Sequence, residues 1–86
     1  MTLTEDDLIQ RHIEPNPRFP GAAEAWLRDS AVPVWAIVGY WLGAAHQDAA
    51  RVAEDYEVPL DAVRAALAYY RQHRRAIDER IAANAV

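Results

Sequence analysis

The apolar positions between residues 34 and 73 recur at helical spacing and predict three consecutive helices. The first covers 34–45 and the second 49–56, with Asp48 as a good N-cap for the second. The third covers 60–73 and follows Val58-Pro59, because the residue before a proline is biased away from helix. The side chains expected in the core share the i, i+3, i+4, i+7 spacing: Val34, Ile37, Val38, Trp41, Ala49, Val52, Ala53, Tyr56, Leu60, Val63, Leu67 and Tyr70.

Two short helices joined by a tight turn, after a packing helix, are typical of a helix-turn-helix. Beyond residue 73 the helical pattern continues over 74–84, with Ile77 and Ile81 as its only large apolar residues. This narrow apolar stripe on a polar helix predicts a tail that is free to bind a partner. His46 lies where the first helix should stop, and histidine tolerates the positive φ that such an end favours.

The N-terminal third has a different pattern. Thr4 and Asp7 resemble a capping box and predict a short helix over 5–11. Three prolines and a glycine then predict an extended arm over 12–21. Two short segments, 26–28 and 31–33, flank Asp29-Ser30 and predict a β-ribbon with a polar turn.

The expected fold is therefore mainly α: a trihelical helix-turn-helix core with a short N-terminal β-hairpin and arm, and a C-terminal helical extension. A chain of 86 residues has room for one hydrophobic core. We expect a single domain over 1–86, made of an N-terminal helix and arm (1–24), a β-ribbon (25–33), the helix-turn-helix core (34–73) and the helical tail (74–86).

Composition narrows the classes of function. The formal net charge of -4 has the wrong sign for a protein that coats nucleic acid without specificity. The absence of cysteine excludes disulfides, thiolate chemistry and cysteine-based zinc sites, and it fits a reducing compartment. The acidic N-terminus and the lack of a long apolar run predict a soluble cytoplasmic protein with no membrane association.

Candidate chemistry is sparse. His12, His46 and His73 lie far apart in the sequence and predict no metal site. Ser30 has no Gly-x-Ser-x-Gly context, and the three glycines lack the grouping of a phosphate loop. We therefore expect no enzyme activity, no cofactor and no bound metal.

The arginines are the candidates for binding. Arg28, Arg64 and Arg71 are expected to contact DNA, although Asp61 near Arg64 would repel a phosphate. In the tail, the residues expected to bind a protein partner combine guanidinium groups with the apolar stripe: Arg74, Arg75, Ile77, Arg80 and Ile81.

Three ordered segments resemble a short bacterial family called domain of unknown function 433. They are 25–35 (AWLRDSAVPVW), 52–56 (VAEDY) and 65–70 (AALAYY), followed by His73, Ile77 and Asp78 at the family's spacing, so that the resemblance covers residues 13–83. The family is similar to VapB-type antitoxins of type II toxin-antitoxin systems, whose partners are PIN-like ribonuclease toxins. The chain departs from the family at 29–31, where it has Asp-Ser-Ala instead of Gly-Thr-Arg.

The resemblance implies a helix-turn-helix core with a short N-terminal β element, a homodimer, binding to operator DNA, and a tail that binds the toxin. We therefore expect an antitoxin-like protein. Two alternatives stay open: a stand-alone helix-turn-helix regulator that binds DNA, and a protein-protein adaptor with no DNA role. Salt-dependent binding to an upstream palindrome would indicate the regulator, and neither DNA nor toxin binding would indicate the adaptor.

Overall fold

The computed structural model describes residues 3–84, and over that range it confirms the predicted fold class: a mainly helical protein with a small antiparallel sheet near its N-terminus. In chain order the elements are α1 (Glu5–His12), β1 (Ile13–Glu14), the 3-10 turn η1 (Ala22–Glu24), β2 (Trp26–Leu27), α2 (Val34–Leu42), α3 (Ala49–Tyr56), α4 (Leu60–Gln72) and α5 (Arg74–Asn84).

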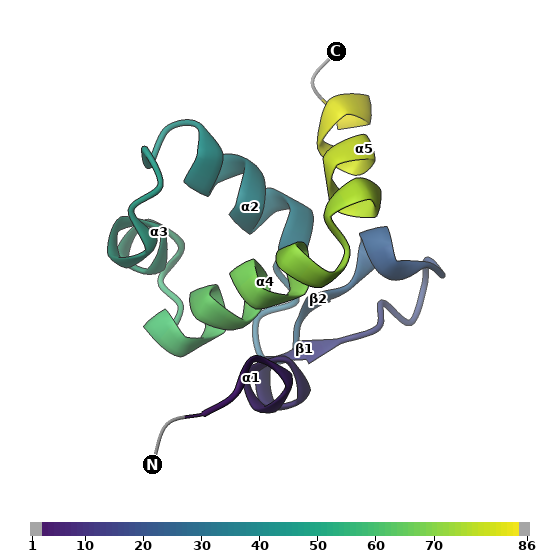
Figure 1. Ribbon diagram of the computed structural model, residues 1–86, viewed down its shortest axis with the longest axis horizontal. Helices are drawn as coiled ribbons and strands as arrows, with labels where there is room; N and C mark the ends of the chain where they lie inside the picture. Colours follow the sequence, from purple (N-terminus) through teal and green to yellow (C-terminus); the bar gives the residue numbers. More distant parts are fainter. Residues whose placement is uncertain (1–2, 85–86) are drawn as a thin grey trace.

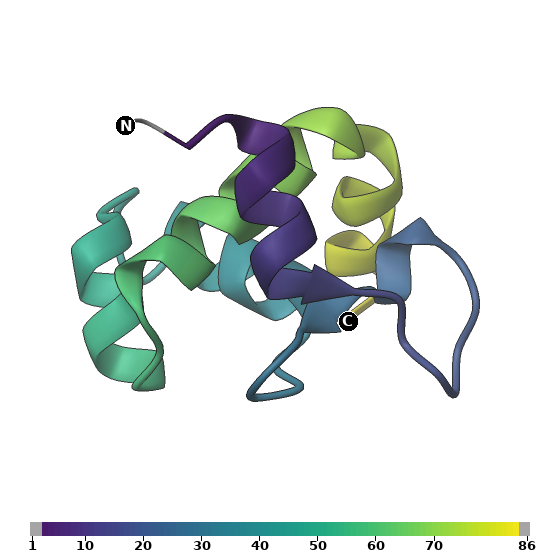
Figure 2. The same cartoon turned by 90° about the horizontal axis from the view of Figure 1, so that it is seen from below.

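Helix α4 is the centre of the molecule. Figure 1 shows α1 and the sheet on one side of α4, with α2 and α3 on the other, and Figure 2 shows α1 lying across it. The buried residues of α4 are mostly alanine and tyrosine: Ala62, Val63, Ala65, Ala66, Leu67, Ala68, Tyr69 and Tyr70. Alanine side chains are small, so neighbouring helices can approach α4 closely. The second helix of the predicted helix-turn-helix is therefore an internal helix.

Both predicted N-caps are present. Thr4 Oγ1 accepts a hydrogen bond from the Asp7 N–H at 3.1 Å, and Asp7 Oδ2 accepts one from the Thr4 N–H at 3.2 Å, which completes the capping box of α1. Asp48 Oδ1 accepts a bond from the Arg51 N–H at 3.2 Å at the start of α3. The bounds predicted for α3 are confirmed, and α1 is one residue longer than predicted.

The predicted hairpin forms only in part, and the main partner of β2 is another strand. Strand β2 pairs with β1, with Ile13 opposite Leu27, and only a single bridge joins Trp26 to Pro33 in the predicted hairpin. The arms of the hairpin are joined by hydrogen bonds from the Leu27 N–H to the Val32 carbonyl at 2.8 Å and from the Val34 N–H to the Ala25 carbonyl at 3.0 Å. The β1–β2 pair lies deeper, since Ile13 and Leu27 are both buried, 6% and 2% exposed, and pack in the core. The predicted turn after β2 is confirmed, because the Ala31 N–H bonds to the Leu27 carbonyl at 2.8 Å.

Helix α2 ends three residues before its predicted end. Gly43, at φ -99° and ψ -97°, leaves the helical conformation, and the Gln47 N–H bonds back to the Trp41 carbonyl at 2.6 Å. The chain thereby folds over the end of α2 and buries Ala45. The positive φ predicted for His46 is confirmed at 51°.

Leu60 was predicted to be in the core, but it is 38% exposed. It is the first residue of α4, so no preceding helical turn covers it. The predicted stripe is confirmed for Val34, Ile37, Val38, Val52 and Val63, which are fully buried, and for Leu67 and Tyr70, which are also buried. The other predicted core residues are half-buried at the edge of the core: Trp41, Ala49, Ala53 and Tyr56.

The predicted free tail is also wrong. The chain breaks helix at His73, at φ -130° and ψ 38°, and α5 turns to pack against α2 and η1 (Figure 1). Ile77 is 0% exposed in the core. Ile77 is therefore the main apolar anchor of α5, because burying a side chain of this size stabilises a contact by about 1.5–3 kcal/mol.

Candidate binding surfaces

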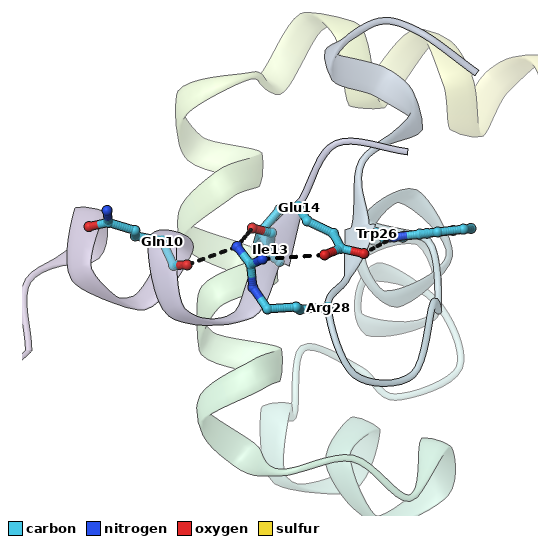
Figure 3. A network of polar contacts seen from close by, with 5 residues as sticks. All are labelled: Gln10, Ile13, Glu14, Trp26 and Arg28. Carbon is cyan, nitrogen blue, oxygen red and sulfur yellow. Dashed lines mark hydrogen bonds and ion pairs between the residues drawn. The ribbon is translucent and has the colours of Figure 1, made fainter. Parts of the chain in front are cut away.

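Arg28 closes the end of α1 (Figure 3). Its Nη2 donates to the carbonyls of Gln10 and Ile13 at 3.1 and 3.0 Å, and its Nη1 donates to Glu14 Oε1 at 3.3 Å. The other carboxylate oxygen of Glu14 accepts from the Trp26 indole at 2.8 Å. The last carbonyls of a helix lack partners inside the helix and carry partial negative charge. Arg28 supplies those partners, so its guanidinium is engaged within the chain.

The other two predicted DNA contacts are also paired with acids. Arg71 binds Glu5 at 2.8 Å, at the start of α1, and Arg64 lies 3.7 Å from Asp61. Arg28 and Arg71 thus hold opposite ends of α1, and Arg64 belongs to a separate exposed pair. The structure does not bring these three arginines together as one basic face.

Two of the residues predicted to bind a partner are engaged inside the fold, which corrects the prediction. Ile77 is buried and has no surface to offer. Arg80 Nε donates to Glu24 Oε2 at 2.8 Å, and its guanidinium lies 4.4 Å from the centre of the Trp35 ring. Both side chains fix α5 to the rest of the molecule. Ile77 is packed in the core, and the partners of Arg80 lie on η1 and α2.

The remaining predicted partner residues stay at the surface. Arg75 pairs with Glu79 on its own helix, at 3.2 Å, and its side chain is 93% exposed. Arg74 is exposed, with its guanidinium 4.8 Å from the centre of the Tyr70 ring. Ile81 is half-buried and lies beside Gly39 of α2.

A hollow of about 390 Å³, which we call the α2 groove, runs along the outer face of α2. Its lining is Trp35, Ala36, Gly39, Tyr40, Tyr56, Ile81 and Asn84. Tyr40 packs edge-on against Tyr56 of α3, with ring centres 5.3 Å apart, and Ile81 is contributed by α5. The α2 groove is therefore aromatic, with the small residues Ala36 and Gly39 between larger side chains.

The charged groups beside the α2 groove are neutralised by one another. Arg80 pairs with Glu24, and Arg51 pairs with Asp55 at 3.5 Å. The Tyr40 hydroxyl donates to Asp55 at 2.5 Å, and this hydrogen bond raises the pKa of Tyr40 above its ordinary value. The lining therefore carries no net charge at neutral pH.

The absence of charged residues around α2 could have indicated this surface from the sequence, but the apolar periodicity was interpreted only as a buried face. Residues 30–47 include no Asp, Glu, Lys or Arg, in a chain that is 26% charged. The apolar spacing in α2 accounts for its inward face, but the outward residues are uncharged as well. Charged residues are expected on the outer face of a surface helix, so their absence was the available indication.

Within residues 3–84, no helix has the length and apolar character needed to cross a membrane. The same range holds no group of three or more histidine, aspartate and glutamate side chains arranged to bind a metal ion.

Comparisons with known proteins return no relative: no family model, no curated protein and no solved structure matches the chain. The resemblance to domain of unknown function 433 therefore stays a prediction.

Proposed function

We propose that the protein acts by binding another protein, in the manner of a type II antitoxin, and that an apolar helix of its partner lies in the α2 groove. The observation that carries this proposal is that α2 is a surface helix without a charged residue. Contiguous apolar surface marks interaction sites, and aromatic side chains are enriched at the centres of protein interfaces.

The chemistry of the α2 groove supports a helix as its occupant. Ala36 has a small side chain, so a partner can approach α2 closely there, while Ile81 of α5 lies against Gly39 and forms one side of the groove. A charged side chain entering this lining would lose water without gaining a counter-charge. The occupant is therefore an uncharged apolar face, and the partner implied by the family resemblance is a PIN-like ribonuclease toxin.

This proposal revises the role of the tail. Ile81 keeps its predicted part in binding because it lines the α2 groove. Ile77 and Arg80 act indirectly, since they hold α5 in place as one side of that groove. Arg74 and Arg75 remain available at the base of α5.

Binding to operator DNA has less support than binding to a protein. Each arginine predicted to contact DNA is paired with an acid, and α4 is covered by α1 on the side opposite α2. The adaptor alternative would use the same groove and differs only in the identity of the partner.

The test is co-expression with a PIN-like ribonuclease, followed by co-purification and a binding titration. Ala36→Glu places a carboxylate in the groove and is expected to weaken binding at least about 30-fold, the effect of losing an interface hot spot. Ala50→Glu makes the same substitution at an exposed position of α3 outside the groove, and it should bind like the wild type.

Circular dichroism of both variants checks that they fold. The proposal fails if the wild-type protein forms no complex with a PIN-like nuclease, or if Ala36→Glu binds as tightly as Ala50→Glu.

A further inference from the structure

The junction between α4 and α5 concentrates positive charge in a chain that is acidic as a whole. Arg71, Arg74 and Arg75 fall within five consecutive residues. Arg71, Arg74 and Arg75 are exposed at the surface. Arg71 pairs with Glu5 and Arg75 with Glu79, both in exposed pairs, so an anion that reached this cluster would compete with exposed carboxylates.

A second hollow, of about 250 Å³, lies at this junction, and we call it the junction hollow. Its lining is Trp41, Leu42, Gln47, Leu67, Tyr70, Arg71 and Arg74. All charged side chains in this lining are positive. The junction hollow therefore combines two guanidinium groups and an amide with aromatic and apolar surface, and it is separate from the α2 groove.

These side chains suit a phosphate next to a flat ring. A guanidinium group binds phosphate through two parallel hydrogen bonds. Trp41 is half-buried at the end of α2, so that part of its indole faces the hollow, and Leu42 beside it is 43% exposed. Sites that bind single-stranded nucleic acid combine basic side chains that contact the phosphate backbone with aromatic side chains on which the bases stack.

Arg71 already holds an oxyanion in this structure. Glu5 Oε2 lies 2.8 Å from Arg71 Nη2 and accepts a hydrogen bond from its Nε at 2.9 Å, and Asp6 accepts from the Gln72 amide at 3.0 Å. A carboxylate and a phosphate use the same guanidinium geometry. The Arg71 and Glu5 side chains are 51% and 47% exposed, and exposed pairs of this kind are weak. Glu5 is therefore a competitor that a phosphate can displace.

We propose that the junction hollow binds a single strand of nucleic acid, with a backbone phosphate on Arg71 and Arg74 and a base against Trp41. Single strands are favoured over duplex because α1 covers α4, so α4 is not exposed as a recognition helix that could enter a groove of DNA. This inference uses a different surface from the proposed protein-binding groove, so either can fail without the other.

The experiment measures fluorescence anisotropy of a labelled single strand of about ten nucleotides, within the usual site size, with the full-length protein at low salt. We expect binding that weakens as salt rises. Arg71→Ala and Arg74→Ala should each weaken it about tenfold and each reduce the salt slope by about 0.7, the value for one phosphate contact on a single strand. Glu5→Gln should strengthen it about threefold by removing the competing carboxylate.

Arg64→Ala is the matched control. It removes one exposed arginine from α4, but one that lies outside the junction hollow, so the affinity should not change. Tryptophan fluorescence gives a second readout: the strand should quench the wild-type emission, and Trp41→Phe should abolish that quenching while Trp26 and Trp35 remain as emitters.

Three outcomes would overturn the proposal. One is the absence of any anisotropy change at low salt, and another is an equal loss of affinity in Arg64→Ala, which indicates unspecific attraction. The third is competition by inorganic phosphate, a phosphopeptide or duplex DNA that matches competition by the unlabelled strand, which assigns the hollow to another ligand.

Discussion

Helices α1 and α2 are both short and both pack on α4, but they differ in how much apolar surface they bury and in the polar contacts at their ends. Helix α2 contains no charged residue and buries Val34, Ile37 and Val38 completely. Within Glu5–His12, no side chain is fully buried, and the helix is held at one end by Arg71 and at the other by Arg28. Helix α2 is docked by complete burial of apolar side chains, whereas α1 combines the partly buried Leu8 and Ile9 with hydrogen bonds and ion pairs at its ends.

This difference explains why the two helices leave such different surfaces. Helix α2 has no charged residues to place on its outer face, so it leaves an uncharged aromatic groove. Helix α1 exposes acids, and one of them, Glu5, pairs with Arg71 in the lining of the junction hollow. The mode of docking therefore sets the class of ligand: an apolar protein segment at α2, and an anion where the α1 acids now bind.

The largest effect is expected from cutting the apolar anchor of α2. Ile37→Ala should lower the free energy of unfolding by about 2–5 kcal/mol, because it leaves a cavity at a fully buried position. Leu8→Ala, at a half-buried position of α1, should cost less than half as much. Urea denaturation followed by circular dichroism measures both, and equal losses would contradict the proposed difference between the helices.

A smaller loss is expected when the clamp at the end of α1 is removed. Arg28→Ala should cost about 1 kcal/mol, reduced from the usual value of charged hydrogen bonds because the side chain is 45% exposed. Hydrogen exchange should quicken in α1 and β1 and stay unchanged in α2. Arg28→Lys should restore little, since one ammonium group does not reproduce the planar fork that reaches both carbonyls.

The ion pair at the other end of α1 should contribute less again and should respond to salt. Glu5→Gln is expected to cost about 0.2–1 kcal/mol at low ionic strength and nothing measurable at high salt, because the pair is exposed and screened. The loss caused by Ile37→Ala should not depend on salt in this way. Urea titrations at two salt concentrations make the comparison, and a salt-independent cost for Glu5→Gln would show that α1 is not held by charge.

The smallest effect is expected at Tyr69 of α4, whose hydroxyl donates a hydrogen bond to the Ala22 carbonyl at 2.7 Å. Burial raises the pKa of Tyr69 above its ordinary value of 10.0. The folded state thus favours the protonated hydroxyl, so the stability that it contributes is present below pH 10.0 and is lost as pH rises through the folded pKa. In an ultraviolet titration, Tyr69→Phe should remove a late-ionising tyrosine, and an unchanged curve would contradict this assignment.

The sequence predicted best what depends on neighbours in the chain. The capping box of α1, the Asp48 cap and the bounds of α3 are all confirmed. A cap joins a side chain to a backbone group three residues away, and the apolar stripe of a helix recurs within one or two turns, so a short window of sequence contains both partners.

The candidate sites were predicted only in part, because they depend on residues that are far apart in the chain. Of the predicted partner-binding residues, Ile81 lines the α2 groove and Arg74 lines the junction hollow, whereas Ile77 is buried. Nothing local distinguishes Ile77 from Ile81, because both lie on the same narrow stripe of α5. Their difference arises from the angle at which α5 leaves α4, and that angle is set at His73.

By itself, then, the sequence determined the helices, their caps and the uncharged stretch that forms α2. Tertiary structure alone decided which strand β2 pairs with and which arginines face solvent. Arg28, Arg71 and Arg80 meet their acids across 14, 66 and 56 residues of chain. Whether an arginine can bind a ligand depends on which acids the fold brings within hydrogen-bond distance of it. Contacts between residues so far apart in the chain produce no periodic pattern in the sequence.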